Sequence, residues 1–154
     1  MKAESVARLL FQSKKTVAVA ESCTAGLLGH TLTGVSGSSA YFIAGIIAYS
    51  NKAKIKLLRV SPLTLARKGA VSQETALAMA KNVRTLCQTD IGIATTGIAG
   101  PTGGSAQKPV GTVYIAIASP RRQYARRFRF KGSRSQIKNK TVAQALLLLK
   151  QWLR

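Results

Sequence analysis

The stretch 16-TVAVAESCTAG-26 joins a short apolar run to a turn of small and polar residues. The run 16–20 is typical of a buried strand, and Ser22 or Thr24 could cap the helix that follows, which we expect to end near Thr33. A strand that passes directly into a helix is the repeating unit of an α/β fold. The stretch therefore predicts the fold class, and it places a glutamate, a serine and a cysteine at the end of a strand.

The alternation of helix and strand continues along the chain. We expect further strands at 44–49, 91–95, 113–118 and 124–130, and helices at 3–13, 51–58, 70–87 and 135–153, with a short helix starting at Pro62. Asn51 or Ser50 could cap the helix at 51–58, and Ser72 leads the helical pattern within 70–87. The last two strands are joined by 119-SPRRQ-123, which is too short for a parallel crossover, so they should be antiparallel. The prediction is one α/β domain over residues 1–154, with helices on both faces of a mixed, mostly parallel sheet of about five strands.

Composition excludes several classes of protein. Hydrophobic residues make up 46% of the chain, which excludes a disordered tail, and no apolar run reaches the roughly 18 residues of a membrane span. The start of the chain lacks the features of a secretory signal, so we expect a cytoplasmic protein. Cys23 and Cys87 have no CxxC spacing, and the four acids and His30 are scattered along the chain. We therefore predict free thiols, no metal site and no cofactor.

The charge predicts anionic partners. Lys and Arg total 24 against four acids, a formal net charge of +20. Eleven of the basic residues follow Pro120, in 121-RRQYARRFRFKGSR-134 and the helix beyond it. This is a solvated basic face or a nucleic-acid surface, with nonspecific charge-driven binding as the expectation. Strand alternation should bury Tyr124, Phe128 and Phe130 in the core.

Three unusual segments fall at strand ends, where open α/β folds bind ligands: 21-ESCTAG-26, 49-YSNKAK-54 and 96-TGIAGPTGGS-105. Spacing leaves Ser22 and Cys23 both open as nucleophiles. His30 lies about 12 Å along the helix from Ser22, which is too far for a base. A lysine with a lowered pKa is the remaining base, and Lys54 is close to the second strand end, although a solvated role is commoner for any one lysine.

Four strings of the sequence resemble the CinA carboxy-terminal domain family: 20-AESCTAG-26, 37-GSSAYFIAGIIAYSNKAKIKLL-58, 69-GAVSQETA-76 and 96-TGIAGPTGGSAQKPVGTVYIA-116. That family includes the stand-alone nicotinamide-nucleotide amidohydrolase. The resemblance implies a three-layer α/β/α fold without a metal or cofactor, and often a homo-oligomer. It implies hydrolysis of the carboxamide of nicotinamide mononucleotide to nicotinate mononucleotide and ammonia.

The resemblance also implies roles for individual residues. Ser22 matches the nucleophile, Lys54 the general base and Tyr49 a nearby assisting residue. Thr96 matches a site residue at the third strand end. Arg134 matches the arginine of the family's usual GDR, which holds the site or the anionic substrate.

Three further residues join the predicted substrate site. The amides around Ser22–Thr24 would stabilise a tetrahedral intermediate, which brings in Thr24. Gly97 opens a Gly/Pro-rich loop, 97–111, that suits a phosphate. Glu21 orients the turn, binds substrate or has a purely structural role.

The sequence departs from the family pattern at two positions near these residues. Ala25 stands where the family usually has a glycine, which would matter if the backbone needs a positive φ and would be harmless in a first helical turn. Ser133 replaces the usual aspartate before Arg134. Two other functions stay open: a basic nucleic-acid-binding protein with a vestigial pocket, and an amidase acting on another amide nucleotide.

Overall fold

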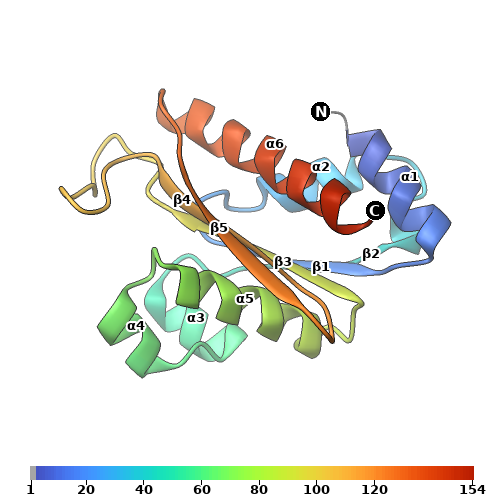
Figure 1. Ribbon diagram of the computed structural model, residues 1–154, viewed down its shortest axis with the longest axis horizontal. Helices are drawn as coiled ribbons and strands as arrows, with labels where there is room; N and C mark the ends of the chain where they lie inside the picture. The colour runs from blue at the N-terminus through green and yellow to red at the C-terminus, as the bar shows by residue number, and fades with distance from the viewer. Residues whose placement is uncertain (1–2) are drawn as a thin grey trace.

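The computed structural model describes residues 3–154 and shows a five-stranded mixed sheet between two layers of helices (Figure 1). The strand order is β2-β1-β3-β4-β5. In sequence order the strands are β1 Val17–Glu21, β2 Phe42–Ile47, β3 Ile91–Gly97, β4 Thr112–Ala118 and β5 Gln123–Arg129. β1 pairs in parallel with β2 and β3, whereas β4 is antiparallel to both β3 and β5. Four strands thus run one way and β4 runs the other way, which confirms the mixed, mostly parallel sheet.

The helices lie on both faces of the sheet (Figure 1). One layer holds α1 (Ala3–Ser13), α2 (Leu27–Thr33) and α6 (Arg134–Trp152). The other holds α3 (Asn51–Leu58), α4 (Pro62–Lys68) and α5 (Gln73–Leu86). A short 3₁₀ turn, η1 (Ser38–Ala40), precedes β2. Within the described residues, no helix combines the length and the apolar character needed to cross a membrane.

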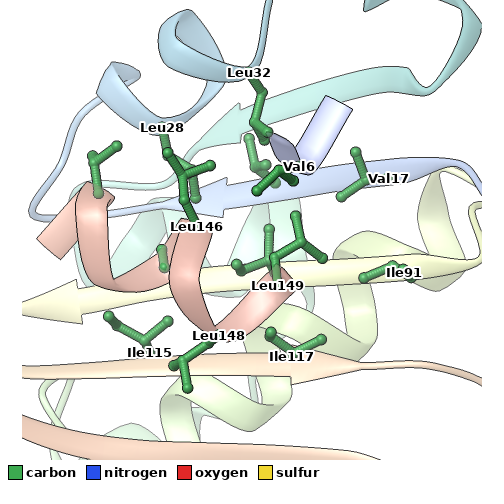
Figure 2. Close-up of a cluster of buried hydrophobic side chains, with 14 of the residues drawn as sticks. Val6, Val17, Leu28, Leu32, Ile91, Ile115, Ile117, Leu146, Leu148 and Leu149 are labelled. Atoms are coloured by element: carbon green, nitrogen blue, oxygen red, sulfur yellow. The ribbon is translucent and has the colours of Figure 1, made fainter. Parts of the chain in front are cut away.

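Large and small side chains alternate along the strands, so one face of the sheet has large apolar side chains and the other has small ones. In β1, Val17 and Val19 face α1, α2 and α6, while Ala18 and Ala20 belong to the cluster that packs under α5. β4 repeats the pattern, with Ile115 on the first face and Ala116 on the second. Figure 2 shows the large side chains interdigitating with leucines of α2 and α6. Because successive strand residues face opposite sides, one run of sequence builds a thick core on one face and a close helix contact on the other.

The contact of α5 with the sheet is close enough to require glycine in β3. A Cβ on Gly92 would lie 2.0 Å from the carbonyl oxygen of Ala80 in α5. No other residue fits there without moving the helix backbone. The small residues of β3 are thus part of what brings α5 onto the sheet.

Most predicted helix starts are confirmed. Ser50 caps α3 by accepting from the Ala53 N–H at 3.0 Å, Ser72 caps α5, and Pro62 is in the first turn of α4. The prediction for α2 was wrong. The helix begins only at Leu27, and its N-cap is Gly26, with φ +95° and no side-chain cap bond. Neither Ser22 nor Thr24 caps it, because the chain makes a separate turn before the helix starts.

Two strand predictions need correction. β2 covers Phe42–Ile47 rather than 44–49, because its pairing with β1 ends where β1 ends, at Glu21↔Ile47. Phe128 of β5 and Phe130, which follows the strand directly, are partly buried against the core, as expected, but Tyr124 is 43% exposed. Tyr124 lines a hollow between β5 and Trp152 of α6, so the helix layer does not fully cover the tyrosine.

Candidate active site

The loops that follow β1, β2 and β3 meet at the carboxyl ends of these parallel strands. They enclose a hollow of about 260 Å³ whose lining includes Ser22, Tyr49, Lys54 and the segment 96–100. The side chain of Arg134, at the start of α6, completes it. The structure therefore brings together the three strand-end segments that the sequence singled out. It also adds Ala70 and Val71, which sequence reasoning had not assigned to the site. Their signal was the string 69-GAVSQETA-76, quoted only for its family resemblance.

Ser22 and Lys54 form the polar centre of the hollow. Lys54 Nζ lies 3.0 Å from Ser22 Oγ, 3.0 Å from the Ala48 carbonyl oxygen and 2.9 Å from the Tyr49 carbonyl oxygen. The lysine is 1% exposed and the serine 8% exposed. Burial lowers the pKa of Lys54 from its usual value, because the ammonium loses its hydration. A buried lysine held against a serine hydroxyl is chemically suited to take up that hydroxyl proton.

The structure distinguishes Ser22 from its neighbour Cys23. Burial raises the pKa of the Cys23 thiol to about 12, and only 5% of the residue is exposed. A thiol with so high a pKa stays protonated near neutral pH and is a poor nucleophile. His30 is exposed on α2 and does not line the hollow. Both observations favour Ser22, paired with Lys54, as the reactive group.

Glu21 holds the turn that carries Ser22. Its Oε2 accepts from the backbone N–H groups of Gly26 and Leu28, both at 3.0 Å, and its Oε1 accepts from Gly29 N–H at 2.8 Å. The carboxylate is 1% exposed and caps α2 from the preceding strand, where the helix dipole favours a negative charge. This explains why α2 has no cap from its own N-cap residue.

Thr24 belongs to the same buried network. Its hydroxyl donates to Glu21 Oε2 at 2.5 Å and lies 2.7 Å from the Thr95 hydroxyl of β3. Neither Glu21 nor Thr24 has a side chain in the lining of the hollow. The structure therefore places both beneath the hollow, where they hold the turn that carries Ser22, which is one of the roles considered for Glu21.

Some backbone N–H groups around the hollow are already hydrogen-bonded, and others are free to bind an anion. The Ser22 N–H donates to the Thr95 carbonyl at 3.0 Å, so it is not free for an oxyanion, contrary to the expectation for this turn. Among residues 3–154 the Cys23 and Thr24 N–H groups have no backbone partner, although the Cys23 N–H interacts with its own thiol. Over the same residues, the N–H groups at 99–100 and 102–103 in the glycine-rich loop have no backbone partner either. Unpaired amides that border a hollow provide sites for anions.

Arg134 links the rim of the hollow. Its Nη1 donates to the Gly100 carbonyl and its Nη2 to the Tyr49 hydroxyl, each at 2.8 Å. Ser133 is the N-cap of α6 and forms a capping box with Gln136, so the serine at this family position still fixes the helix start. Thr96 Oγ1 donates to the Ala70 carbonyl at 2.8 Å, which ties the end of β3 to the loop before α5.

Comparison with known proteins identifies the family. The model of the CinA C-terminal domain matches residues 1–153. The chain belongs to the CinA C-terminal domain family. A CinA-like protein of Syntrophus aciditrophicus is 51% identical over 150 residues, which is 97% of this chain and 36% of that protein. A CinA-like protein of Geobacter sulfurreducens is 48% identical over 97% of this chain and 35% of its own length. The chain thus spans about a third of the length of the curated relatives it matches.

Solved structures of the CinA superfamily share the whole architecture. The competence damage-inducible protein A of Klebsiella pneumoniae superposes with a TM-score of 0.95 at 34% identity, over 98% of this chain and 94% of that one. The competence/damage inducible protein of Agrobacterium tumefaciens gives a TM-score of 0.93 at 38% identity, over 99% and 96%. The CinA fold is therefore confirmed for this chain over nearly its full length.

Proposed function

We propose that this CinA-family chain is a metal-independent amidohydrolase that hydrolyses the carboxamide of nicotinamide mononucleotide, with Ser22 as nucleophile and Lys54 as general base. The observation that carries the proposal is the buried 3.0 Å contact between Lys54 Nζ and Ser22 Oγ. Family membership is consistent with a nicotinamide-nucleotide amidase. The hollow beside Ser22 has the size of a small-molecule subsite and is lined by anion-binding groups.

The two carbonyl contacts suit Lys54 to the role of base. A neutral amine has two hydrogens and one lone pair. Donation to the Ala48 and Tyr49 carbonyls uses both hydrogens, and the lone pair is then left for the Ser22 hydroxyl. Burial favours this neutral form because it penalises the ammonium.

The reaction then follows two balanced steps. Ser22 Oγ attacks the carboxamide carbon while its proton passes to Lys54, and the C=O becomes an oxyanion whose stabilisation we assign to the backbone N–H of Cys23, a residue that lines the hollow. Collapse breaks the C–N bond, and Lys54 returns the proton to the leaving nitrogen, which departs as ammonia. Water, deprotonated by Lys54, attacks the Ser22 ester. The ester C–O bond then breaks, Lys54 returns the proton to Ser22 Oγ, and nicotinate mononucleotide is released. Preorganised donors of this kind are worth about 3 kcal/mol each in the transition state.

Groups at the other side of the hollow suit the substrate phosphate. The unpaired amides of 99–100 and 102–103 and the guanidinium of Arg134 border the same space as Ser22. Arg134 uses one nitrogen for Gly100 and one for Tyr49, which fixes the plane of its guanidinium before substrate binds. We assign phosphate recognition to this loop and this arginine, with Tyr49 and Thr96 shaping the space between.

The test is ammonia release from nicotinamide mononucleotide in the presence of EDTA. Ser22→Ala and Lys54→Met should each lower kcat/KM by at least about 100-fold, since a nucleophile or base contributes that much or more. Lys52→Met is the matched control for Lys54, because it removes an exposed lysine from the same helix. All variants should melt cooperatively.

The same assay tests phosphate recognition and the choice of substrate. Nicotinamide riboside, which lacks the phosphate, should be turned over with a raised KM. Preference for a different amide nucleotide would keep the chemistry and reassign the substrate. Full activity in folded Ser22→Ala would refute the proposed nucleophile.

A further inference from the structure

The outer edge of the sheet has alternating arginine and aromatic side chains on its α6 side. Tyr124 and Arg126 of β5 line a hollow of about 370 Å³ together with Trp152 of α6. Arg122, in the turn before β5, lines the same hollow, and Phe128 packs against the core on this face. We call Arg122, Tyr124, Arg126, Phe128 and Trp152 the β5 surface. Figure 1 shows β5 at the open edge of the sheet, with α6 beside it.

No ion pair of the described residues joins a carboxylate to the β5 surface, and the one acid that shares a hollow with Arg122 and Trp152 is Asp90, which pairs with Lys15. The four acids of the chain are Glu4, Glu21, Glu74 and Asp90, so the sequence has no acid after Asp90. The ion pairs found among residues 3–154 join Lys15 to Asp90 and Lys68 to Glu74, and neither includes a residue of β5. The uncompensated positive charge lies along a strand whose outer edge has no neighbouring strand.

The arginines are held against rings. The guanidinium carbon of Arg122 is 3.9 Å from the centre of the Trp152 ring, and its Nη2 donates to the Trp152 carbonyl at 2.7 Å. The guanidinium carbon of Arg126 is 5.3 Å from the centre of the Phe128 ring. Among residues 3–154 the Arg126 guanidinium makes no hydrogen bond, so its N–H groups are available to a ligand. Tyr124 lies between the two arginines in sequence, with 43% of the residue exposed.

We propose that the β5 surface binds single-stranded nucleic acid, with phosphates on Arg122 and Arg126 and a base stacked on Tyr124. Residues two apart in a strand are about 6.6 Å apart on the same face. Arg122 and Arg126 are therefore about 13 Å apart, which suits two phosphates of an extended strand on either side of an unstacked base that lies on the Tyr124 ring. The alternation therefore matches a repeating anion that also carries planar groups.

Other polyanions fit the surface less well. A paired duplex keeps its bases stacked inside and would leave Tyr124 unused. A lipid surface would need exposed apolar side chains to insert, and after Leu86 the exposed large hydrophobic residues described in the structure are limited to Tyr124. A solvated edge that only prevents strand-to-strand aggregation needs charge but no accessible ring.

The hollow at the β5 surface shares no lining residue with the hollow beside Ser22, and its Arg122 end is the more distant one. β4 ends at Ala118, which pairs with Gly92 near the amino end of β3, whereas the hollow beside Ser22 lies at the carboxyl end of β3. The turn that follows β4 and leads to Arg122 is thus at the opposite end of the strands. Binding at β5 can therefore be tested without affecting ammonia release.

The experiment titrates the whole chain with short oligothymidylate and oligouridylate and follows both anisotropy and tryptophan fluorescence. Trp152 is the single tryptophan of the sequence, so its fluorescence reports on this surface directly. Binding should quench it. Arg126→Gln should reduce the slope of log affinity against log salt by about 0.7, the value for one phosphate contact on a single strand. Lys52→Gln, the same charge change on α3, should leave the quenching intact.

Tyr124 separates stacking from charge. Tyr124→Leu should weaken oligothymidylate binding by about five-fold or more, while Tyr124→Phe should retain it, because a stacked base contributes at least about a factor of five. Inorganic polyphosphate has no bases, so its binding should be equal in both variants. Equal losses for Arg126→Gln and Lys52→Gln, or binding without a change in Trp152 fluorescence, would overturn the proposal and leave only diffuse charge attraction. Preferential binding to anionic vesicles over oligonucleotides would overturn it in favour of a lipid surface.

Discussion

Ala25 holds a backbone conformation that an alanine side chain disfavours, and Ala25→Gly should stabilise the protein. The residue has φ +49°, in the left-handed region, and lies in the turn between Ser22 and α2. Its side chain is exposed, so its removal gives up little packing. Of the two alternatives considered for Ala25, the structure thus shows the one in which the backbone has a positive φ, at a position where the family usually has glycine.

The size of the effect follows from two opposing terms. An L-residue in the left-handed region costs about 1–2 kcal/mol that glycine avoids. Glycine in turn has about 0.4–1 kcal/mol more conformational entropy to lose on folding. The difference is a gain of roughly 0.5–1 kcal/mol in the free energy of unfolding. For a chain of this length that raises Tm by about 1–4 °C.

Thermal and urea unfolding of Ala25→Gly should be compared with Ala66→Gly. Ala66 is an exposed residue of α4, so the same atoms are removed from a helical backbone. Glycine in a helix costs about 1 kcal/mol relative to alanine, and Tm should fall. The two variants should therefore shift stability in opposite directions. A loss of stability in Ala25→Gly equal to that in Ala66→Gly would show that the turn does not strain Ala25.

Further expectations concern the site and its supports. Because burial lowers the pKa of Lys54, kcat/KM for ammonia release should rise with pH up to an apparent pKa below 10.5 and fall about ten-fold per pH unit beneath it. Glu21→Gln sets an amide N–H₂ among N–H donors and should cost about 1–3 kcal/mol in unfolding free energy, measured by urea denaturation. Gly97→Ala would bring a Cβ to 2.6 Å from a Val113 methyl carbon, so Tm and ammonia release should both fall. In a Cys87→Ser background, Cys23 should react with a thiol reagent only after unfolding, because it is buried and its pKa is raised to about 12.

Much of the fold was predictable because it rests on local patterns. The apolar run of β1 and the two-residue alternation of β5 indicated strands, and the caps Ser50 and Ser72 indicated the starts of α3 and α5. The five residues between β4 and the predicted last strand fixed their antiparallel pairing. Each of these signals acts over a few residues, so the sequence carries it directly.

The start of α2 was not predictable from such signals. Its cap is the carboxylate of Glu21, which reaches forward from the end of β1 to three amides of the turn and helix. That arrangement depends on a positive φ at both Ala25 and Gly26, which local propensity does not indicate. A standard capping pattern pointed to Ser22 and Thr24 instead.

The sequence by itself determined the element types, the mixed sheet and the set of strand-end segments, because periodicity, caps and connection length are local properties of a chain. It also indicated, through family resemblance, that Ser22 and Lys54 belong together. Only the tertiary structure placed these two residues, 32 positions apart, at 3.0 Å and buried Lys54 against two carbonyls. The physical reason is that a lowered lysine pKa comes from desolvation, and desolvation depends on which distant segments cover the side chain.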